Sequence, residues 1–401
     1  MIVRELRPNV YSLSALDWDR KIFDELVPLP DGTSYNAYLV KGSEKTVLID
    51  TVHPSMSEGF IKALKSLGLT RLDYIVSNHA ELDHAGSIPA VLAAFPEAKV
   101  LANAKCRSLL AASLDLPREM FGLIQDNGTL SLGDRSLRFM WMPWVHWPDT
   151  TVTYLEPDNI LFTCDFFGAH LATSELYATE EARVERAARM YYAEIMMPYR
   201  KQISKHLDRL AIENIALIAP SHGPVYHRPE FILQLYREWA EDATRPEVII
   251  PYLSMYESTT KMVNYLIDRL MEKGLKVQPF NVVELDSGRF ASALVEASTL
   301  IFASPTVLDG AHPAMATAAY LVNALKAKAG YAGIIGSYGW GTSMPDNLRS
   351  LLPNLNANWF VPVIASGVPK AEDFTALDRL AGDICLANSA AAEPGPTIRL
   401  D

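Results

Sequence analysis

The chain has 401 residues, which allows two or three domains, and its 49% hydrophobic and 21% charged residues are typical of a globular protein. The formal net charge of -11 argues against a general nucleic-acid binder, because such proteins present a basic surface. No apolar run approaches the roughly 18 residues of a transmembrane helix, and the first residues lack the long apolar region of a secretory signal.

The cysteines give a further expectation about the compartment. Cys106, Cys164 and Cys385 are far apart in the chain and form no CxxC pair. The sequence therefore predicts neither a disulfide framework nor a cysteine zinc site. A reducing compartment fits this pattern, so we expect a cytoplasmic protein that binds neither nucleic acid nor membrane.

Up to about residue 245, short apolar runs alternate with turn residues and a few helical segments. Runs such as residues 33–40 and 45–50 predict strands, and the turn residues at 127–128 and 133–134 are typical of hairpins. Residues 57–68 show the helical spacing of apolar positions. This mixture predicts an α+β domain or a layered α/β/β/α domain.

After residues 245–246 strands and helices alternate strictly, so we place a domain boundary there, with domains at 1–245 and 246–401. Near-continuous apolar strands separated by helices indicate a doubly wound parallel sheet of the α/β class. The last residues, 390–401, are expected to form a loose tail. The predicted strands are residues 247–253, 276–283, 299–304, 332–337 and 359–366, and the predicted helices are residues 258–274, 314–328, 344–353 and 370–384.

The stretch SNHAELDHAGS at residues 77–87 places His79, Glu81, Asp83 and His84 within six residues. It follows an apolar run and precedes a helical-looking segment, so it lies on a strand-to-helix loop, where functional residues are common. So many titratable groups packed together need a counter-charge. We therefore interpret the stretch as part of a metal site.

Three more candidate ligands, His146, Asp165 and His222, lie at or near the ends of later apolar runs. Taken alone, His146 or His222 would be an ordinary structural histidine. Together the seven residues suit two divalent metals about 3.5–4 Å apart, with a carboxylate such as Asp165 between them. Because no cysteine is in the set, iron, manganese and zinc fit equally well.

Three loops of the second half are candidates for binding a mononucleotide. Residues 254–261 are rich in hydroxyl groups and lead into a helix N-terminus, which suits a phosphate. There is no P-loop lysine and no GxGxxG, which argues against a nucleoside triphosphate and a dinucleotide. Residues 304–310 and 336–342 follow later strands, and the second of these loops carries Tyr338 and Trp340, a setting for a flat ring. We expect FMN to bind here. The expected contacts are Ser254, Met255, Tyr256, Glu257, Ser258, Thr259, Pro305, Thr306, Val307, Leu308, Asp309, Gly310, Ser337, Tyr338, Gly339 and Trp340.

The whole chain resembles the flavodiiron proteins, also called A-type flavoproteins. HAELDH at residues 79–84 and the three later ligands match their metallo-β-lactamase-like domain, and the three loops match their flavodoxin-like domain. The resemblance implies an N-terminal metallo-β-lactamase-like αββα sandwich and a C-terminal flavodoxin-like doubly wound parallel sheet. Metallo-β-lactamase hydrolases carry HxHxDH, whereas here Glu81 stands at the second histidine position, which favours iron redox chemistry.

The resemblance further implies that one iron binds His79, Glu81 and His146, and that the other binds Asp83, His84 and His222, with Asp165 bridging. In some family members the histidine at position 84 stays off the metal. The implied activity is reduction of O2 to water or of NO to N2O, with electrons passing through FMN from a separate donor such as rubredoxin. Family members are head-to-tail homodimers, which can pair into dimers of dimers.

Some positions and alternatives remain open in the sequence. Asp24 follows Phe23 where many members carry a histidine, so the preference for O2 or NO is not fixed. Glu257 stands where a small or neutral residue is common. Tyr191 and Tyr192 either contact the ligands or belong to a packed helix face. The competing functions are a zinc hydrolase fused to a flavodoxin and an electron-transfer flavoprotein with an idle metal domain.

Overall fold

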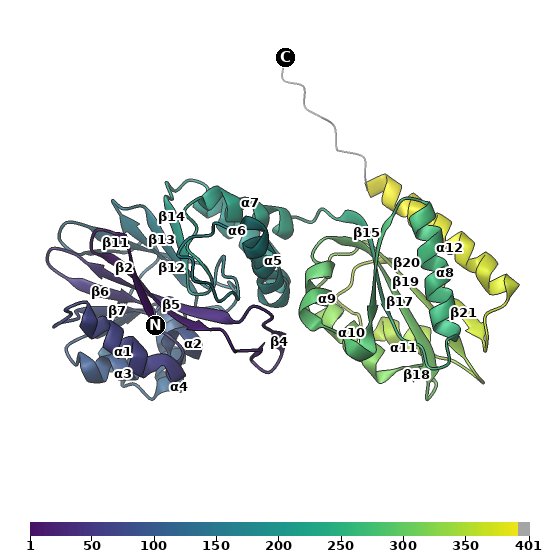
Figure 1. Cartoon of the computed structure of the whole chain (residues 1–401), viewed down its shortest axis with the longest axis horizontal. Coiled ribbons are helices and arrows are strands. Elements are labelled where there is room, and N and C mark those ends of the chain that lie inside the picture. The colour runs from purple at the N-terminus through teal and green to yellow at the C-terminus, as the bar shows by residue number, and fades with distance from the viewer. Residues whose placement is uncertain (392–401) are drawn as a thin grey trace, which may run out of the picture. The chain divides into compact units, whose positions relative to one another are not determined.

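The computed structural model describes residues 1–391, and they form two compact units (Figure 1). The first is Met1–Ala240 and the second begins at Glu241. Of the tail expected at 390–401, residues 390 and 391 belong to the end of the last helix, and the remainder lies outside the described residues. None of the helices within residues 1–391 has the length and apolar character needed to cross a membrane.

The first unit contains two sheets that pack face to face. The larger sheet has the strand order β1-β2-β5-β6-β7-β8-β9, and the smaller has the order β10-β11-β12-β13-β14. The strands of the larger sheet are β1 Ile2–Arg7, β2 Val10–Asp17, β5 Thr33–Lys41, β6 Thr46–Ile49, β7 Tyr74–Val76, β8 Lys99–Ala102 and β9 Phe121–Leu123. Those of the smaller sheet are β10 Thr129–Ser131, β11 Ser136–Trp141, β12 Thr151–Glu156, β13 Ile160–Cys164 and β14 Leu217–Pro220. A small ribbon, β3 Ile22–Phe23 and β4 Val27–Pro28, pairs separately.

Strand β5 shows how the layers form, because it is buried on both faces. Successive side chains of a strand point to opposite faces. Tyr35 and Leu39 pack with the helices on the outer face of the larger sheet, whereas Tyr38 and Val40 pack into the core between the two sheets.

Helices cover both outer faces of this sandwich. On the larger sheet, α1 buries Phe60, Ala63 and Leu64 at the i, i+3, i+4 spacing of an amphipathic helix. The arrangement is an αββα sandwich, as expected. Helices α1 Ser57–Ser66, α2 Leu82–Ala85, α3 Ile88–Ala94 and α4 Ala104–Leu114 belong to the first part of the unit, and α5 Glu181–Tyr191, α6 Arg200–Leu210 and α7 Pro229–Ala240 belong to the second. A π-helical turn at Tyr192–Met196 follows α5 directly, and short 3-10 turns lie at Pro54–Met56, Arg118–Met120 and Met197–Tyr199.

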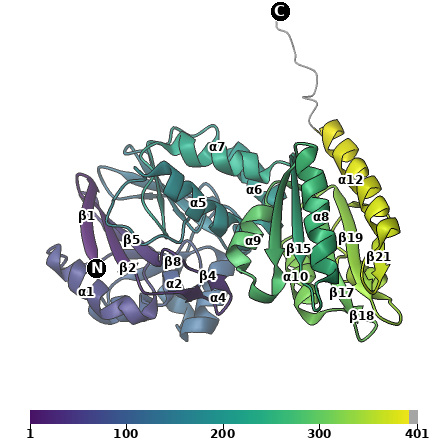
Figure 2. The same ribbon diagram turned by 45° about the vertical axis from the view of Figure 1, so that its right-hand side comes forward.

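The second unit is a parallel sheet with the order β16-β15-β17-β19-β20, with β21 also paired to β19. In chain order this is the 2-1-3-4-5 arrangement of flavodoxin-like sheets. Helices α8 and α12 pack on one face, and α9 and α10 lie on the other (Figures 1 and 2). The strands are β15 Arg245–Tyr252, β16 Lys276–Asn281, β17 Ala297–Val307, β18 Gly310–Ala311, β19 Tyr331–Tyr338, β20 Asn358–Trp359 and β21 Val363–Ser366. The helices are α8 Ser258–Glu272, α9 Ser287–Leu294, α10 Pro313–Ala324, α11 Met344–Ser350 and α12 Ala371–Ala391, with a 3-10 turn at Val282–Glu284.

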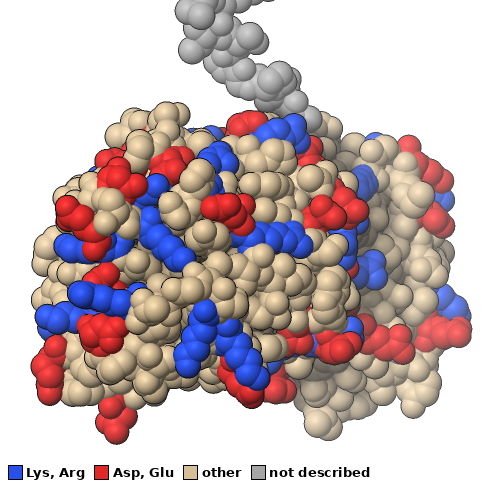
Figure 3. All heavy atoms as spheres, turned by 60° about the vertical axis from the view of Figure 1, so that its left-hand side comes forward, with Lys and Arg blue, Asp and Glu red and all other residues tan. Residues whose placement is uncertain are grey.

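The expected fold class is therefore confirmed for both units. One expected strand, residues 359–366, is divided into β20 and β21. Pro362 lies in the gap and has no N–H to donate to a strand ladder. On the face drawn in Figure 3, acidic and basic side chains are intermixed and form no continuous basic patch.

Candidate metal and flavin sites

The seven candidate ligands come from four separate segments of the first unit. His79 and Glu81 lie on the loop after β7, and Asp83 and His84 lie in the short helix α2 that this loop enters. The three later ligands come from strand ends of the smaller sheet. His146 lies on the β11–β12 connection, Asp165 follows β13 directly, and His222 follows β14.

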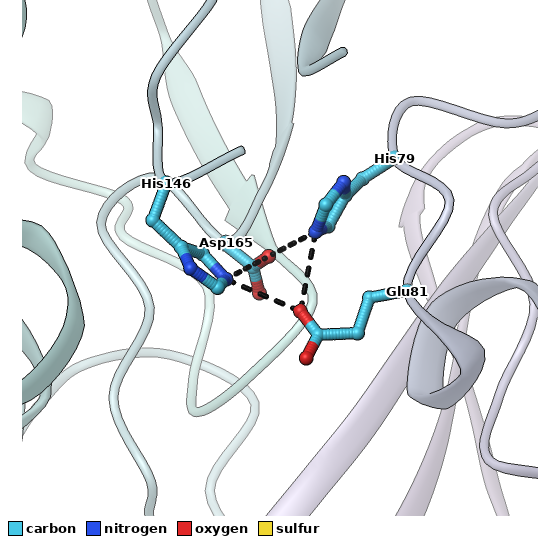
Figure 4. Close-up of side chains that lie close together, drawn as sticks. All are labelled: His79, Glu81, His146 and Asp165. Atoms are coloured by element: carbon cyan, nitrogen blue, oxygen red, sulfur yellow. Dashed lines mark hydrogen bonds and ion pairs between the residues drawn. The ribbon is translucent and has the colours of Figure 1, made fainter. Parts of the chain in front are cut away.

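The first group contains His79, Glu81, His146 and Asp165, whose side chains point toward one another (Figure 4). Oε2 of Glu81 lies 3.2 Å from Nε2 of His79 and 3.2 Å from Nε2 of His146. Oδ2 of Asp165 lies 3.5 Å and 3.6 Å from the same two nitrogens. Two imidazoles and two carboxylates thus converge on one point.

The second group contains Asp83, His84 and His222. Asp83 lies 3.3 Å from Nε2 of His84 and 3.1 Å from Nε2 of His222. Oδ1 of Asp165 is 2.8 Å from His84 and 3.5 Å from His222. Asp165 therefore offers one oxygen to each group. The ring of His84 is directed into this group.

Burial tests whether these residues suit metal ions. Asp83, His84 and Asp165 are almost fully buried. Within residues 1–391, both oxygens of Asp83, both nitrogens of His84 and Oδ2 of Asp165 lack a well-formed hydrogen bond, and all of them except Nδ1 of His84 face only ion-pair contacts within the cluster. A buried polar group without a partner costs about 1–3 kcal/mol, and more when it is charged. Divalent cations would satisfy these atoms, so the residues fit a pair of metals.

The charges of the cluster are strongly coupled. Burial favours neutral histidine, yet the carboxylates of Asp165 and Asp83 outweigh it and raise the pKa of His84 to about 10. Burial also opposes the charged form of His146, but the carboxylates of Asp165 and Glu81 outweigh it and raise the pKa of His146 to about 9. Burial would raise the pKa of Glu81, but the imidazoles of His146 and His79 hold it well below its ordinary value. The metal-free site is thus a set of buried ion pairs.

Polar groups behind the ligands hold them in place, and the sequence analysis identified none of the three described here. Nδ1 of His79 lies 3.2 Å from both oxygens of Asp149. Nδ1 of His222 lies 2.7 Å from the carbonyl oxygen of Ser34. Asp50, also fully buried, accepts hydrogen bonds from Asn78 on the ligand loop. The only signal for Asp149 is its place in the turn just after His146 and before a buried strand.

The two adjacent tyrosines have different bonds. The hydroxyl of Tyr191 donates a 2.7 Å hydrogen bond to Asp165, and that of Tyr192 donates to the carbonyl oxygen of Trp239. Phe23 covers another side of the cluster, with its ring 6.1 Å from that of His222. Burial, followed by the charges of Glu81 and Asp83, raises the pKa of the neighbouring Asp24.

The three candidate flavin loops lie at the carboxyl ends of β15, β17 and β19, which are neighbours in the sheet. This edge is where open α/β sheets bind ligands. Tyr256, Leu308 and Trp340 are among the most exposed large side chains of the described residues. The buried Oγ of Ser254 has no hydrogen-bond partner there, and α8 begins at Ser258 with free N–H groups. These three loops therefore fit a ligand with a phosphate group and a flat ring.

Comparison with known proteins agrees with this architecture. Residues 33–223 match the family model described as "ODP family beta lactamase". The "Nitric oxide reductase" of Moorella thermoacetica is 34% identical over 83% of this chain and 85% of its own length. The "Rubredoxin-oxygen oxidoreductase" of Megalodesulfovibrio gigas is 30% identical over 94% of this chain and 95% of its own length.

Solved structures extend the similarity to the whole fold. The rubredoxin oxygen:oxidoreductase from Desulfovibrio gigas superposes with a TM-score of 0.94 at 29% identity, covering 98% of this chain and 100% of that one. The flavodiiron protein from Giardia intestinalis gives 0.89 at 26% identity, covering 98% of each chain. A lactamase-type sandwich joined to a flavodoxin-like sheet defines a class of flavin-containing oxidoreductases. The chain belongs to the flavodiiron proteins, or type A flavoproteins, which confirms the resemblance.

Proposed function

We propose that this protein carries out the four-electron reduction of O2 to water, the two-electron reduction of NO to N2O, or both. The single observation that carries the proposal is the position of Asp165, which offers one carboxylate oxygen to each of two adjoining groups of ligands. The names of the relatives, nitric oxide reductase and rubredoxin-oxygen oxidoreductase, support these two substrates.

In this proposal the two groups hold two irons. When bound, the irons supply redox-active positions for a diatomic molecule, and FMN supplies electrons to them. Glu81 favours iron over zinc, because it places a hard carboxylate where zinc hydrolases have an imidazole. His79, Glu81 and His146 would hold one iron and Asp83, His84 and His222 the other, with one oxygen of Asp165 available to each.

The protein groups around the ligands keep this geometry and exclude water. Asp149 and Ser34 accept from the outer nitrogens of His79 and His222, so that the inner nitrogens face the metals. Tyr191 holds the bridging carboxylate. The rings of Phe23, Tyr35 and His170 pack against that of His222 and limit the access of water to it.

The remaining assignments belong to the same proposal. Residues 1–245 form the di-iron domain and residues 246–401 the FMN domain, in which the three loops hold the flavin. The electron donor is a separate cytoplasmic protein such as rubredoxin. A head-to-tail homodimer, or a dimer of such dimers, would bring the flavin loops of one chain beside the ligands of another.

The test is rapid mixing of the reduced protein with O2 and, separately, with NO. Iron, zinc and FMN are measured on the same sample. We expect two irons and one FMN per chain and rapid consumption of at least one gas. Two zincs without iron would contradict the proposal in favour of a hydrolase. If the reduced, fully iron-loaded protein consumes neither gas, the proposal is wrong and the protein is an electron-transfer flavoprotein.

A further inference from the structure

The outer nitrogens of three ligand histidines have three different environments. Nδ1 of His79 lies 3.2 Å from each oxygen of the Asp149 carboxylate. Nδ1 of His222 lies 2.7 Å from a neutral backbone carbonyl, that of Ser34. Nδ1 of His84 is buried and has no hydrogen-bond partner in residues 1–391. The outer nitrogen of His79 therefore contacts a full negative charge, that of His222 contacts a carbonyl dipole, and that of His84 has no hydrogen-bond partner in residues 1–391.

Asp149 is fixed in place independently of any metal. Its side chain is fully buried, and the N–H of Ala80 donates a 2.9 Å hydrogen bond to Oδ2. The side-chain amide of Asn103 donates to the backbone carbonyl of Asp149 and to the hydroxyl of Thr151. Because Asn103 also accepts from the first turn of α4, the backbone of Asp149 is anchored to a helix. Among the described residues, His79 is its one ion-pair partner.

The ligands themselves do not distinguish the two positions. Each group has two imidazoles and one carboxylate of its own, Glu81 in one and Asp83 in the other, and they share Asp165. The formal charge of the two positions is therefore equal when only ligands are counted. Asp149 breaks this equality, because it places a negative charge in direct contact with one imidazole of the first group. Asp50, the other buried carboxylate nearby, acts on His84 only through space, since neither nitrogen of His84 has a hydrogen-bond partner in residues 1–391.

We propose that Asp149 is a positioning residue that makes the two metal positions unequal, so that the position of His79, Glu81 and His146 binds a divalent cation more tightly than the other. This inference rests on the metal pair of the proposed function. A carboxylate behind a ligand imidazole fixes its tautomer with Nε2 free for the metal and increases its basicity. A backbone carbonyl orients the ring but adds no net charge.

The difference in burial between the two positions favours the opposite order of metal affinity, so an experiment can distinguish the two effects. Glu81 and His146 have side chains that are 17% and 16% exposed, whereas those of Asp83, His84 and His222 are at most 4% exposed. Attraction between a cation and carboxylates is stronger where water is excluded. If burial dominated, the second position would bind first.

The experiment uses the full-length chain stripped of metal with a chelator and titrated with Co2+. We expect two binding steps, and anomalous diffraction from crystals grown with one equivalent should place the ion beside His79 and Glu81. In Asp149→Asn, the affinity of this first step should fall about 10- to 100-fold, the usual effect of removing such a partner. The second step should change much less.

Asp50→Asn is the matched control. Asp50 is another buried carboxylate near the ligand loop, and it accepts hydrogen bonds from both nitrogens of Asn78. Its replacement removes a buried charge whose main electrostatic neighbour is His84 of the second group, and it leaves the outer nitrogen of His79 and its partner Asp149 in place. We expect the order of filling to be unchanged. An equal loss in both variants would assign the effect to general destabilisation and overturn the role of Asp149.

A measurement on the wild type does not depend on the folding of any variant. In the Zn2+-loaded, 15N-labelled wild type, the His79 N–H held by Asp149 should give a low-field proton resonance that correlates with a histidine Nδ1. Equal affinity at the two positions, or filling of the Asp83 position first, would overturn the inference and leave the proposed function intact. Failure of both positions to bind any divalent metal would overturn the proposed function as well.

Discussion

The hydroxyl of Tyr191 donates a 2.7 Å hydrogen bond to Oδ1 of Asp165, and both side chains are buried. This is the oxygen that lies 2.8 Å from Nε2 of His84. Tyr191 therefore fixes the rotation of the carboxylate that lies between the two groups of ligands. Burial, reinforced by the negative charge of Asp165, raises the pKa of Tyr191 well above its ordinary value, so it remains a donor at neutral pH.

Replacing Tyr191 by phenylalanine should leave the metals bound but loosen the bridge. A hydrogen bond to a charged group contributes about 1.5–3 kcal/mol, so Tyr191→Phe should lower the free energy of unfolding by about that amount. Gas reduction should slow several-fold at unchanged iron content. Chemical denaturation and stopped-flow assays measure the two effects.

Tyr192→Phe is the matched control, since Tyr192 is the next residue and donates to the carbonyl oxygen of Trp239. A bond between neutral groups contributes about 0.5–1.5 kcal/mol, and its loss should not alter turnover. Equal loss of turnover in the two variants would show that the tyrosines act through packing and not through Asp165.

Removing the shared carboxylate should affect both metals at once. In Asp165→Ala, each group loses one oxygen, so we expect little or no stable metal at either position. FMN should remain bound, because its loops belong to the other unit. Metal analysis and flavin absorbance on one sample check both expectations.

Asp165→Asn is the companion variant, because it keeps the shape and one acceptor oxygen but removes the charge. We expect intermediate metal content there. Full occupancy of two metals in Asp165→Ala would be incompatible with the bridging role.

The proposed ligands could be selected from the sequence because His79, Glu81, Asp83 and His84 form one local pattern that packing does not require. His146, Asp165 and His222 have no such pattern of their own, and they were selected because together with that stretch they complete a two-metal set. Asp149 was not, because a buried aspartate in a turn has the same local sequence as an exposed one; only the fold brings it to His79. Which of the two tyrosines contacts Asp165 depends on the direction in which each side chain leaves the helix, at the point where α5 passes into a π-helical turn. The sequence pattern shows which residues are polar, but it does not show the direction of these two side chains.

The metal-free protein should become less stable as pH rises above neutrality. The pKa of His84 is raised to about 10 and that of His146 to about 9 in the folded state, by carboxylates that outweigh burial. In the unfolded chain both would titrate near 6.5. A raised folded pKa contributes stability that is complete below the unfolded pKa and is lost as pH rises through the folded pKa.

Thermal unfolding of the chelated protein between about pH 6 and about pH 10 measures this effect. The lower limit lies near the pKa of about 6.5 in the unfolded chain, and the upper limit is the folded pKa of His84, about 10. The melting temperature should fall across the window, and His146→Gln should flatten the slope. With metal bound the slope should also be smaller, because the metals hold the imidazoles neutral. A melting temperature that rises with pH in the chelated protein would contradict the ion-pair description of the site.

The flavin loops give the last prediction, through the close approach of β17 and β19. Gly336 on β19 pairs with Ser304 on β17, and a Cβ at Gly336 would lie 1.9 Å from the Ser304 carbonyl oxygen. Gly336→Ala must therefore push the strands apart just where the loops 304–310 and 336–342 begin. Overpacking of this kind typically costs about 1–3 kcal/mol. We expect the purified variant to contain much less FMN, measured by absorbance after denaturation, while its metal content stays at the wild-type level.

Gly330→Ala, at the opposite end of the same strand, has no heavy atom within 4 Å of the added Cβ and should retain flavin. Wild-type flavin content in Gly336→Ala would show that the spacing of these two strands does not control the site.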